Sequence, residues 1–342
     1  MGDTSEPARR WYRLTPGRFI TGLLAVEVFL ALSERFQWLP INQHKGWTVL
    51  MAAGVLAAAF LLLLLWFALA LVFRLHFQYS IRSLLILTIT VAVPCSWLAR
   101  EMKKAEEQRK ARLRLGVTRE NGTATYDWEV DSEFNPLPSP RPPVPPAPGW
   151  LRRLLGDDFF ESVVGVLLAE VRDDDFAAVE QLTQLNSLGL LYSHVTDDGL
   201  GHIKALTQLR CFWIYGADVT DAGVSQLRGL AKLQGLGLGA TPVSDAGIEL
   251  LRDLPELKSL YLRETRVTDA GLERLSHFAH LQELDLTLTR ITDAGLEKLG
   301  TMKELRQLHL GDTKVTSDGV NRLQRQLPEC EIDTDPAVPV YF

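Results

Sequence analysis

Aspartate, histidine and cysteine side chains recur in this 342-residue chain at positions where metal binding or catalysis has to be considered. Five aspartates follow one another at 24-residue steps: Asp197, Asp221, Asp245, Asp269 and Asp293. A column of carboxylates can in principle bind calcium. Each aspartate also opens a helix-like stretch, where a carboxylate can cap the exposed amides of a helix N-terminus. Capping accounts for all five, so we expect no metal site.

Asp285 and His309 come closest to a catalytic pair. They should lie on adjacent strands and be able to hydrogen-bond, but the sequence supplies no nearby nucleophile or pocket. Cys211 lies three strands from Asp285 and four from His309, about 14 to 19 Å at sheet spacing, which is too far for a Cys-His dyad. The sequence also lacks a phosphate loop, a metal cluster and a nucleophile elbow. We therefore predict that the protein is not an enzyme and has no catalytic residue and no cofactor.

The aspartates belong to a 24-residue repeat that occurs six times. Aligned on their first residue, the copies read VTDDGL, VTDAGV, VSDAGI, VTDAGL, ITDAGL and VTSDGV, starting at Val195, Val219, Val243, Val267, Ile291 and Val315. A helix-like stretch and then L-x-x-L-x-L-x-x-T follow, as in Leu257, Leu260, Leu262 and Thr265. A fixed period of this length is the signature of a solenoid, here a leucine-rich repeat.

The paired leucines of each repeat predict the core of this solenoid. Two leucines that lie two residues apart point to the same face of a short strand, and stacked parallel strands bury them in continuous ladders. The period extends back to Val164 and Val166, 24 residues before Leu188 and Leu190, and forward to Ile332. The predicted fold is an α/β leucine-rich-repeat solenoid with about eight strands, a parallel concave sheet and convex helices.

Other repeat positions are expected to have structural roles. A hydroxyl in the turn after the strand can satisfy backbone groups, as expected for Thr241, Thr265, Thr289 and Thr313, and more weakly for Ser193, whereas Ala217 interrupts the column. A glycine after the aspartate should let neighbouring backbones pack closely, at positions 199, 223, 247, 271, 295 and 319. Trp150 to Phe160 and Leu327 to Phe342 are expected to cap the two ends.

Charge and cysteine content exclude two classes of protein. Residues 156–342 contain 17 Lys and Arg against 30 Asp and Glu, a net charge of −13, whereas the residues before them carry +7. An acidic solenoid is a poor partner for phosphate backbones, so we expect no nucleic-acid partner. Cys95, Cys211 and Cys330 are too few and too far apart for a disulfide framework, which suits a reducing compartment.

The residues before the repeats predict attachment to a membrane. A basic flank, 1–18, precedes a transmembrane region, 19–99. Residues 47–73 contain no charged side chain, and 27 helical residues reach roughly 40 Å, enough to cross the bilayer with tilt. Residues 83–99 form a shorter uncharged run. Residues 19–38 contain Glu27 and either span the bilayer or lie at its surface, so two or three transmembrane helices are predicted.

Basic residues predict the orientation. Seven Lys and Arg follow the last uncharged run, and the side that carries them holds the larger number of basic residues with either two or three spans. Both readings place the repeats in the cytoplasm.

The connector between membrane and repeats has two parts. Residues 100–135 predict a charged juxtamembrane helix and a small hairpin that turns at Asn121-Gly122. Residues 136–149 form a proline-rich linker, because proline excludes both helix and sheet; a proline-motif binding site is the alternative. The repeat domain is assigned to 150–335 and a C-terminal tail to 336–342.

The VTDAGL-type repeat resembles the leucine-rich repeats of bacterial membrane-anchored repeat proteins and, with ladder variations, those of F-box adaptor subunits. The stretch FQYSIRSLLILTITVAV, Phe77 to Val93, looks like the membrane segment that precedes such repeats in the bacterial family. The resemblance implies the fold, attachment to a bacterial plasma membrane and protein binding as the usual role. Nothing here resembles an F-box, so an adaptor role would rest on the repeat alone.

Outward-facing strand residues predict the binding surface. If Leu260 and Leu262 face the core, their neighbours in the strand face the concave surface. Gly235, Gly237 and Gly239 would then form a shallow floor between aromatic walls. Because aromatic residues and arginine are enriched at binding hot spots, the candidate partner-binding residues are Trp213, Tyr215, Gly237, Tyr261, Arg263, Asp285 and His309. The alternative is an ordinary surface with scattered aromatics.

These observations predict a membrane-anchored scaffold for protein-protein interaction. Its partners would be an unidentified protein or peptide and, through the N-terminal region, the lipid bilayer, without a small-molecule cofactor. Two alternatives remain: a substrate-selecting adaptor subunit of an enzyme complex, and a structural envelope protein whose repeats self-assemble.

Overall fold

A computed structural model describes residues 81–117, 123–126, 149–278 and 280–336, with only the backbone described at 81–91, 93 and 94. These residues divide into two compact units. One contains the chain up to Glu106 together with residues 149–161, and the other contains residues 107–117, 123–126 and the chain from Ser162 onward.

The first unit contains most of helix α3 (Ile81–Arg114), helix α4 (Gly149–Leu155) and the short 3-10 helix η2 (Asp157–Phe159). Leu151, Phe159 and Phe160 form a hydrophobic cluster with Ala105. The prediction that Trp150 to Phe160 caps the repeats is therefore wrong, because these side chains bury each other instead. The residues that extend the repeat core at its first end are Ala111, Leu115, Val117 and Tyr126.

Helix α3 runs without interruption through the predicted segment 83–99 and into the predicted juxtamembrane helix. Within the described part of the chain, no helix is both long enough and apolar enough to cross a membrane. The predicted spans near 19–38 and 47–73 lie outside the described residues, as do residues 136–148 of the proline-rich linker.

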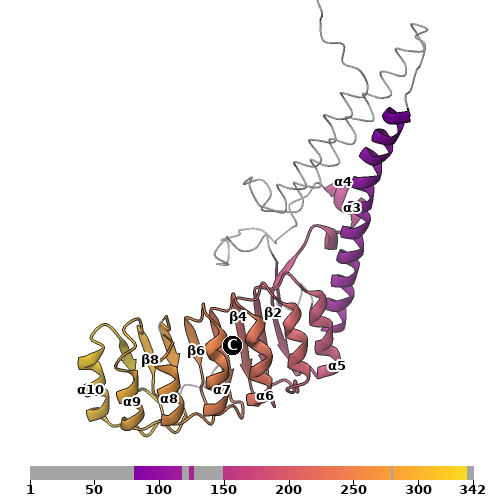
Figure 1. The fold of residues 1–342 in the computed structure, drawn as a ribbon. Coiled ribbons are helices and arrows are strands. Elements are labelled where there is room, and N and C mark those ends of the chain that lie inside the picture. The colour runs from indigo at the N-terminus through magenta and orange to yellow at the C-terminus, as the bar shows by residue number, and fades with distance from the viewer. Residues whose placement is uncertain (1–80, 118–122, 127–148, 279, 337–342) are drawn as a thin grey trace, which may run out of the picture. The chain divides into compact units, whose positions relative to one another are not determined.

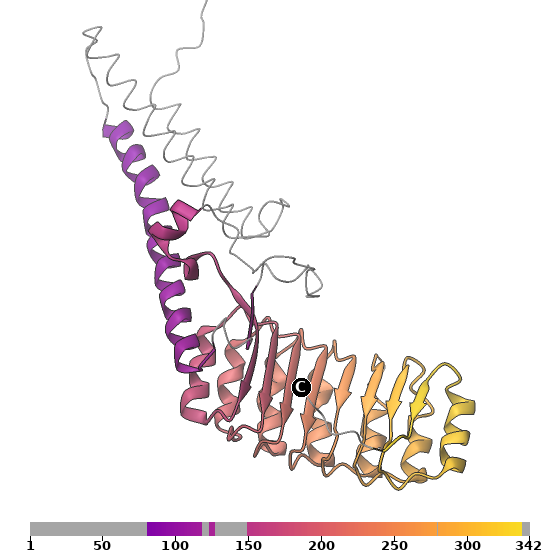
Figure 2. The same ribbon diagram turned by 180° about the vertical axis from the view of Figure 1, so that it is seen from behind.

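The second unit is built on a nine-stranded sheet whose strands follow chain order (Figures 1 and 2). Eight parallel strands confirm the predicted number: β2 (Val163–Ala169), β3 (Ser187–Leu191), β4 (Cys211–Tyr215), β5 (Gly235–Gly239), β6 (Ser259–Tyr261), β7 (Glu283–Asp285), β8 (Gln307–His309) and β9 (Glu331–Asp333). The ninth, β1 (Ala124–Tyr126), pairs antiparallel with β2. Part of the predicted hairpin thus extends the repeat sheet, while its Asn121-Gly122 turn lies outside the described residues.

Short helical segments cover one face of this sheet, as Figure 1 shows. They are α5 (Asp173–Phe176), η3 (Ala177–Gln181), η4 (Gly199–Ala205), α6 (Asp221–Val224), η5 (Ser225–Gly229), α7 (Asp245–Leu250), η6 (Leu251–Asp253), α8 (Asp269–Leu275), α9 (Asp293–Leu299) and α10 (Ser317–Gln326). Leu260, Leu262, Leu284 and Leu286 are fully buried between the two layers. Burying each such side chain contributes about 1.5–3 kcal/mol, so the leucine ladders supply the main stabilisation.

The first repeat departs from the 24-residue register. Val166 pairs with Leu188 and Leu168 with Leu190, a step of 22 residues. Asp173 nevertheless lies 24 residues before Asp197, so the turn after β2 is two residues shorter than the later turns. The predicted equivalence of Val164 and Val166 with Leu188 and Leu190 is therefore wrong. Ile332 does pair with Leu308, as the period predicts.

The threonine column closes the turns as predicted. The hydroxyls of Thr241, Thr265 and Thr313 each donate to the carbonyl three residues earlier, at 2.6–2.7 Å, and Thr289 does the same. Ser193 does not follow them, because its buried Oγ has no hydrogen-bond partner among the described residues.

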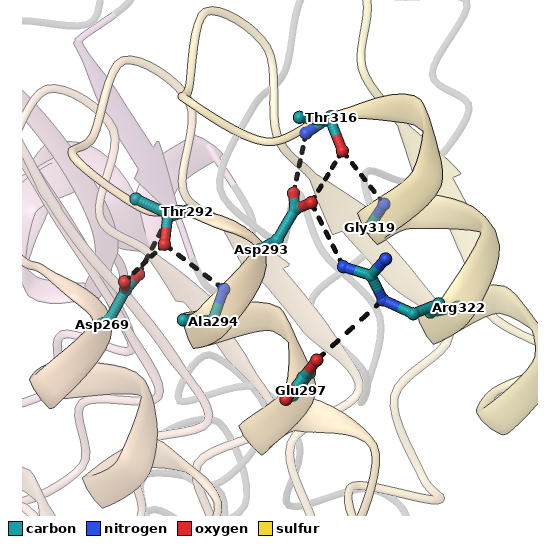
Figure 3. A network of polar contacts seen from close by, with 8 residues as sticks. All are labelled: Asp269, Thr292, Asp293, Ala294, Glu297, Thr316, Gly319 and Arg322. Atoms are coloured by element: carbon teal, nitrogen blue, oxygen red, sulfur yellow. Dashed lines mark hydrogen bonds and ion pairs between the residues drawn. The ribbon is translucent and has the colours of Figure 1, made fainter.

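The aspartate column links successive repeats, and Figure 3 shows two of its members. The N-caps of α6–α10 are Thr220, Ser244, Thr268, Thr292 and Thr316, and each accepts a helix amide on its hydroxyl. Asp245 lies in the first turn of α7, and its carboxylate accepts the amide and the hydroxyl of Thr268 in the next repeat, at 2.8 and 2.6 Å. Predicted capping by the aspartates is therefore wrong. The threonine or serine caps the helix, and the aspartate of the preceding repeat accepts hydrogen bonds from that threonine or serine.

The glycine column makes room for this carboxylate. A Cβ at Gly271 would lie 2.5 Å from Asp245 Oδ1, and the other five glycines are approached by an aspartate in the same way. The group closest to each of these glycines is thus an aspartate side chain, whereas the sequence predicted a neighbouring backbone. The two ends of this series of aspartate links, the aspartate ladder, fit the same explanation. In the first repeat no aspartate precedes, and Asp175 stands at the glycine position. In the last repeat Ser317 stands at the aspartate position, after the last acceptor, Asp293.

We predict that Gly271→Ala and Asp245→Ala are coupled. Gly271→Ala should lower the free energy of unfolding by about 1–3 kcal/mol, because its Cβ collides with the carboxylate. Asp245→Ala should cost a similar amount, because two hydrogen bonds to a charged group are lost. In the double variant the collision is absent, so the loss should be smaller than the sum by about 1 kcal/mol or more in denaturant titrations.

Gly229→Ala is the matched control, because a Cβ there meets no atom within 4 Å. Strictly additive losses in the double variant would contradict the ladder.

Candidate functional site

Trp213 occupies the centre of β4, and both of its neighbours in register are glycines, Gly189 and Gly237. A Cβ on Gly237 would lie 2.7 Å from Trp213 Cε3, and one on Gly235 would lie 3.3 Å from Cζ2. The indole therefore lies against the glycine strand. The predicted shallow floor is wrong, because the Trp213 indole covers the backbone of these glycines, which no Cβ shields.

Tyr261 meets this indole from the far side of the glycine strand. The two rings make an edge contact, with centroids 4.9 Å apart and planes at 71°. Aromatic pairs prefer this geometry over a face-to-face stack. Burial raises the pKa of the Tyr261 phenol, and its hydrogen bond with Glu283 raises it further. The Tyr261 phenol therefore remains protonated. The rings of Trp213 and Tyr261 are both partly exposed on the concave face.

Tyr215 repeats the arrangement at the end of β4. Its ring lies against Gly239, where a Cβ would be 2.7 Å from Cδ2, and makes an edge contact with Tyr192 at 5.6 Å. Its hydroxyl donates to Glu264 Oε2 at 3.1 Å. Burial, followed by this bond, raises the pKa of the Tyr215 phenol, and Arg263 lies close enough to oppose the shift. Tyr215 and Arg263 thus lie together, beside the Trp213 and Tyr261 pair.

Asp285 and His309 are neighbours in register but do not bond to each other. Asp285 Oδ1 accepts the amide of Thr287 at 2.8 Å, and His309 Nδ1 lies 3.2 Å from Asp333 Oδ2. The predicted pair is wrong because the Asp285 carboxylate accepts a backbone amide, and the His309 ring lies against the Asp333 carboxylate on β9 instead. The amide of Asp335 and then His309 lower the pKa of Asp333.

Cys211 lies in β4 and His309 in β8, four strands away in the observed order. Burial raises the pKa of the Cys211 thiol, which disfavours the thiolate that a nucleophile needs. In the described part of the chain, no three His, Cys, Asp or Glu side chains gather closely enough to hold a metal ion.

The concave face carries further residues that sequence reasoning missed. Leu167 covers Gly189 as Trp213 covers Gly237, but the 22-residue step of the first repeat hides this equivalence. Glu331 and Asp333 on β9 join Glu283 and Asp285 on β7, so an acidic surface follows the aromatic one. These acids occupy outward positions at regular steps, and the repeat alignment contains that signal.

Parallel strands in chain order, leucine ladders and a helical stretch between successive strands define a leucine-rich-repeat fold. A family model described as a leucine-rich repeat matches residues 279–300. No curated protein matches the sequence.

Solved structures with a similar fold include two internalins of Listeria monocytogenes. The internalin inlF is 24% identical, with a TM-score of 0.41, and the match covers 51% of this chain and 47% of that one. Internalin C2 is 22% identical, with a TM-score of 0.41, and the match covers 52% of this chain and 74% of that one. The matched region thus spans about half the length of the inlF structure.

We predict that Gly237→Ala displaces the Trp213 ring, because the new Cβ would lie within 2.7 Å of it. The indole N–H resonance of Trp213, assigned with a Trp213→Phe variant, should shift, and the ring contact with Tyr261 should be lost. Gly229→Ala should leave that resonance in place. An unchanged resonance in Gly237→Ala would mean that the indole does not lie on the glycine strand.

Proposed function

We propose that this protein is a membrane-anchored scaffold whose concave sheet binds a segment of another protein. The observation that carries the proposal is the contact of Trp213 with Tyr261 across Gly237. Two rings already fixed against each other offer apolar area with little conformational entropy left to lose on binding. Aromatic residues of this kind dominate the energetics of many protein interfaces.

The charges around the aromatic pair indicate the chemistry of the partner. Glu283 and Asp285 on β7, with Glu331 and Asp333 on β9, follow the aromatic pair along the sheet. Opposite charge on a partner would steer its approach and fix its register. The partner segment should therefore combine an apolar residue, placed against Trp213 and Tyr261, with Lys or Arg side chains facing β7 to β9.

Binding, not catalysis, is the role that we propose for this face. The Cys211 thiol is disfavoured as a thiolate, and the Asp285 carboxylate is already engaged by a backbone amide. An adaptor would use the same face, but crosslinking would then recover a catalytic subunit as its partner. A structural protein would recover mainly other copies of this chain.

We predict that Trp213→Ala with Tyr261→Ala weakens partner binding at least tenfold. Partners are first recovered by crosslinking with the full-length chain, and the affinity of each is then measured for wild-type and variant proteins. Truncating a hot-spot residue costs about 2 kcal/mol or more, which sets the expected size of the effect. Binding should also weaken as salt rises, because basic groups on the partner face the acidic strands.

Trp150→Ala is the matched control, because Trp150 is also an exposed aromatic, 57% accessible, but lies in α4. A double variant that keeps wild-type affinities and the same partners would exclude the concave patch as the binding site.

The membrane anchor rests on residues 47–73, which carry no charge, and on the basic residues that follow 83–99. We propose that they hold the repeats on the cytoplasmic side of a bacterial plasma membrane. The proline-rich residues 136–149 would then separate the repeats from the bilayer by about 3 Å per residue.

We predict that the full-length chain stays with membranes after alkaline carbonate extraction. In sealed inverted vesicles, added protease should digest the repeats, whereas in right-side-out vesicles the repeats should be protected. A chain released by carbonate would contradict the anchor. Digestion in right-side-out vesicles would place the repeats on the opposite side.

A further inference from the structure

The turns that follow β3, β4, β5 and β6 border an open pocket of about 640 Å³ at one edge of the sheet. One residue in each of these turns has a positive φ: Tyr192, Gly216, Ala240 and Glu264. The residues two places further along, His194, Asp218, Pro242 and Arg266, complete the rim. This pocket is separate from the Trp213 and Tyr261 pair, neither of which lines it.

The pocket exists because the two middle turns carry small side chains. Gly216 and Ala217 follow β4, and Ala240 follows β5. Tyr192 forms one wall: it is 59% exposed, lies against Gly216 and meets Tyr215 edge-on. Glu264, held by the Tyr215 hydroxyl, stands at the other wall. Two repeats at about 4.8 Å spacing leave room for one large apolar side chain.

A row of cations extends from this pocket along the same edge. Arg266 lines the pocket, and Arg290 and Lys314 occupy the same position in the next two repeats. All three side chains are exposed, and none forms an ion pair or side-chain hydrogen bond within the described residues. On the helical face, by contrast, Arg252 pairs with Glu249 and Arg322 with Asp293. The row therefore places three exposed positive charges without ion pairs at about 5 Å intervals in an acidic domain.

Ser193 adds a polar group at the pocket wall. Its side chain is 3% exposed and its Oγ has no partner among the described residues, although threonines at this position bond a carbonyl. Buried hydroxyls are nearly always hydrogen-bonded, so an unsatisfied one beside the pocket favours an occupant that also offers a polar group, such as the backbone of a protein segment.

We propose that this turn edge is a second binding surface, which takes an extended acidic protein segment. An apolar side chain of the segment occupies the turn pocket, and its carboxylates lie over Arg266, Arg290 and Lys314. Charge complementarity selects the occupant, because these cations lack acidic partners within the described chain. A nucleic acid fits less well, because its unbroken row of phosphates would also pass Asp218 and Glu264, whereas a protein segment can place an uncharged apolar side chain there.

The test uses the full-length chain and labelled synthetic peptides in fluorescence anisotropy titrations. The probe peptides carry one tryptophan, a glycine spacer and four glutamates, in both chain directions. We expect binding that weakens as salt rises. Replacing the peptide's glutamates with glutamine, or its tryptophan with glycine, should each weaken binding at least tenfold. A single-stranded oligonucleotide of similar charge should bind more weakly than the peptide.

Arg266→Glu with Arg290→Glu should weaken binding of the acidic peptide at least tenfold. The matched control is Lys204→Glu with Lys298→Glu, which changes the net charge equally on exposed residues of η4 and α9 and should bind as wild type does. Circular dichroism checks that both variants are folded, and Trp213→Ala should leave this binding intact.

Three results would overturn the proposal. They are no binding of either probe peptide at millimolar concentration, equal losses in the Arg266/Arg290 and Lys204/Lys298 variants, and an oligonucleotide that binds as tightly as the peptide through the same arginines.

Discussion

The structure depends on one hydrogen-bonded link that is made six times. An aspartate in one repeat accepts the amide and the hydroxyl of a threonine or serine in the next, and this threonine or serine lies at the start of the following helical segment. In the repeats from Thr220 onward the same hydroxyl also accepts a helix amide. No repeat is complete without its neighbour, so the link works with the leucine ladders to make the array cooperative. The glycine that follows each aspartate position leaves the space into which the preceding repeat's carboxylate fits.

This link fixes the step between repeats, and the step gives the concave face its order. Successive strands lie one sheet spacing apart. A side chain therefore contacts the residue at the same position two strands away only when the strand between them carries glycine at that position. Trp213 and Tyr261 meet over Gly237 for this reason. The acids on β7 and β9 then follow as separate columns. The aromatic and acidic surfaces are thus consequences of one register.

The turn edge obeys the same register with a different result. Small residues after β4 and β5 open the pocket, and Glu264 and Arg266 after β6 border it. Arg266, Arg290 and Lys314 are exposed there and form no ion pair within the described residues. The helical face differs: Arg252 and Arg322 have acidic residues within reach one turn or one repeat away. The two candidate surfaces therefore adjoin at Tyr215, which contacts Tyr192 and Glu264, and they differ in charge.

The sequence by itself determined the repeat, the eight parallel strands, the buried leucines and the role of the turn threonines, because each follows from a 24-residue period and a two-residue alternation. It also identified Trp213, Tyr215 and Tyr261 as outward-facing. Only the tertiary structure decided that the aspartates link repeats and do not cap their own helices, because their partner is 23 residues away. It also decided that the indole covers the glycines and that His309 pairs with Asp333. A periodic pattern predicts which face of the sheet a side chain occupies. Which residue that side chain contacts depends also on the spacing between strands and on the direction in which the side chain extends.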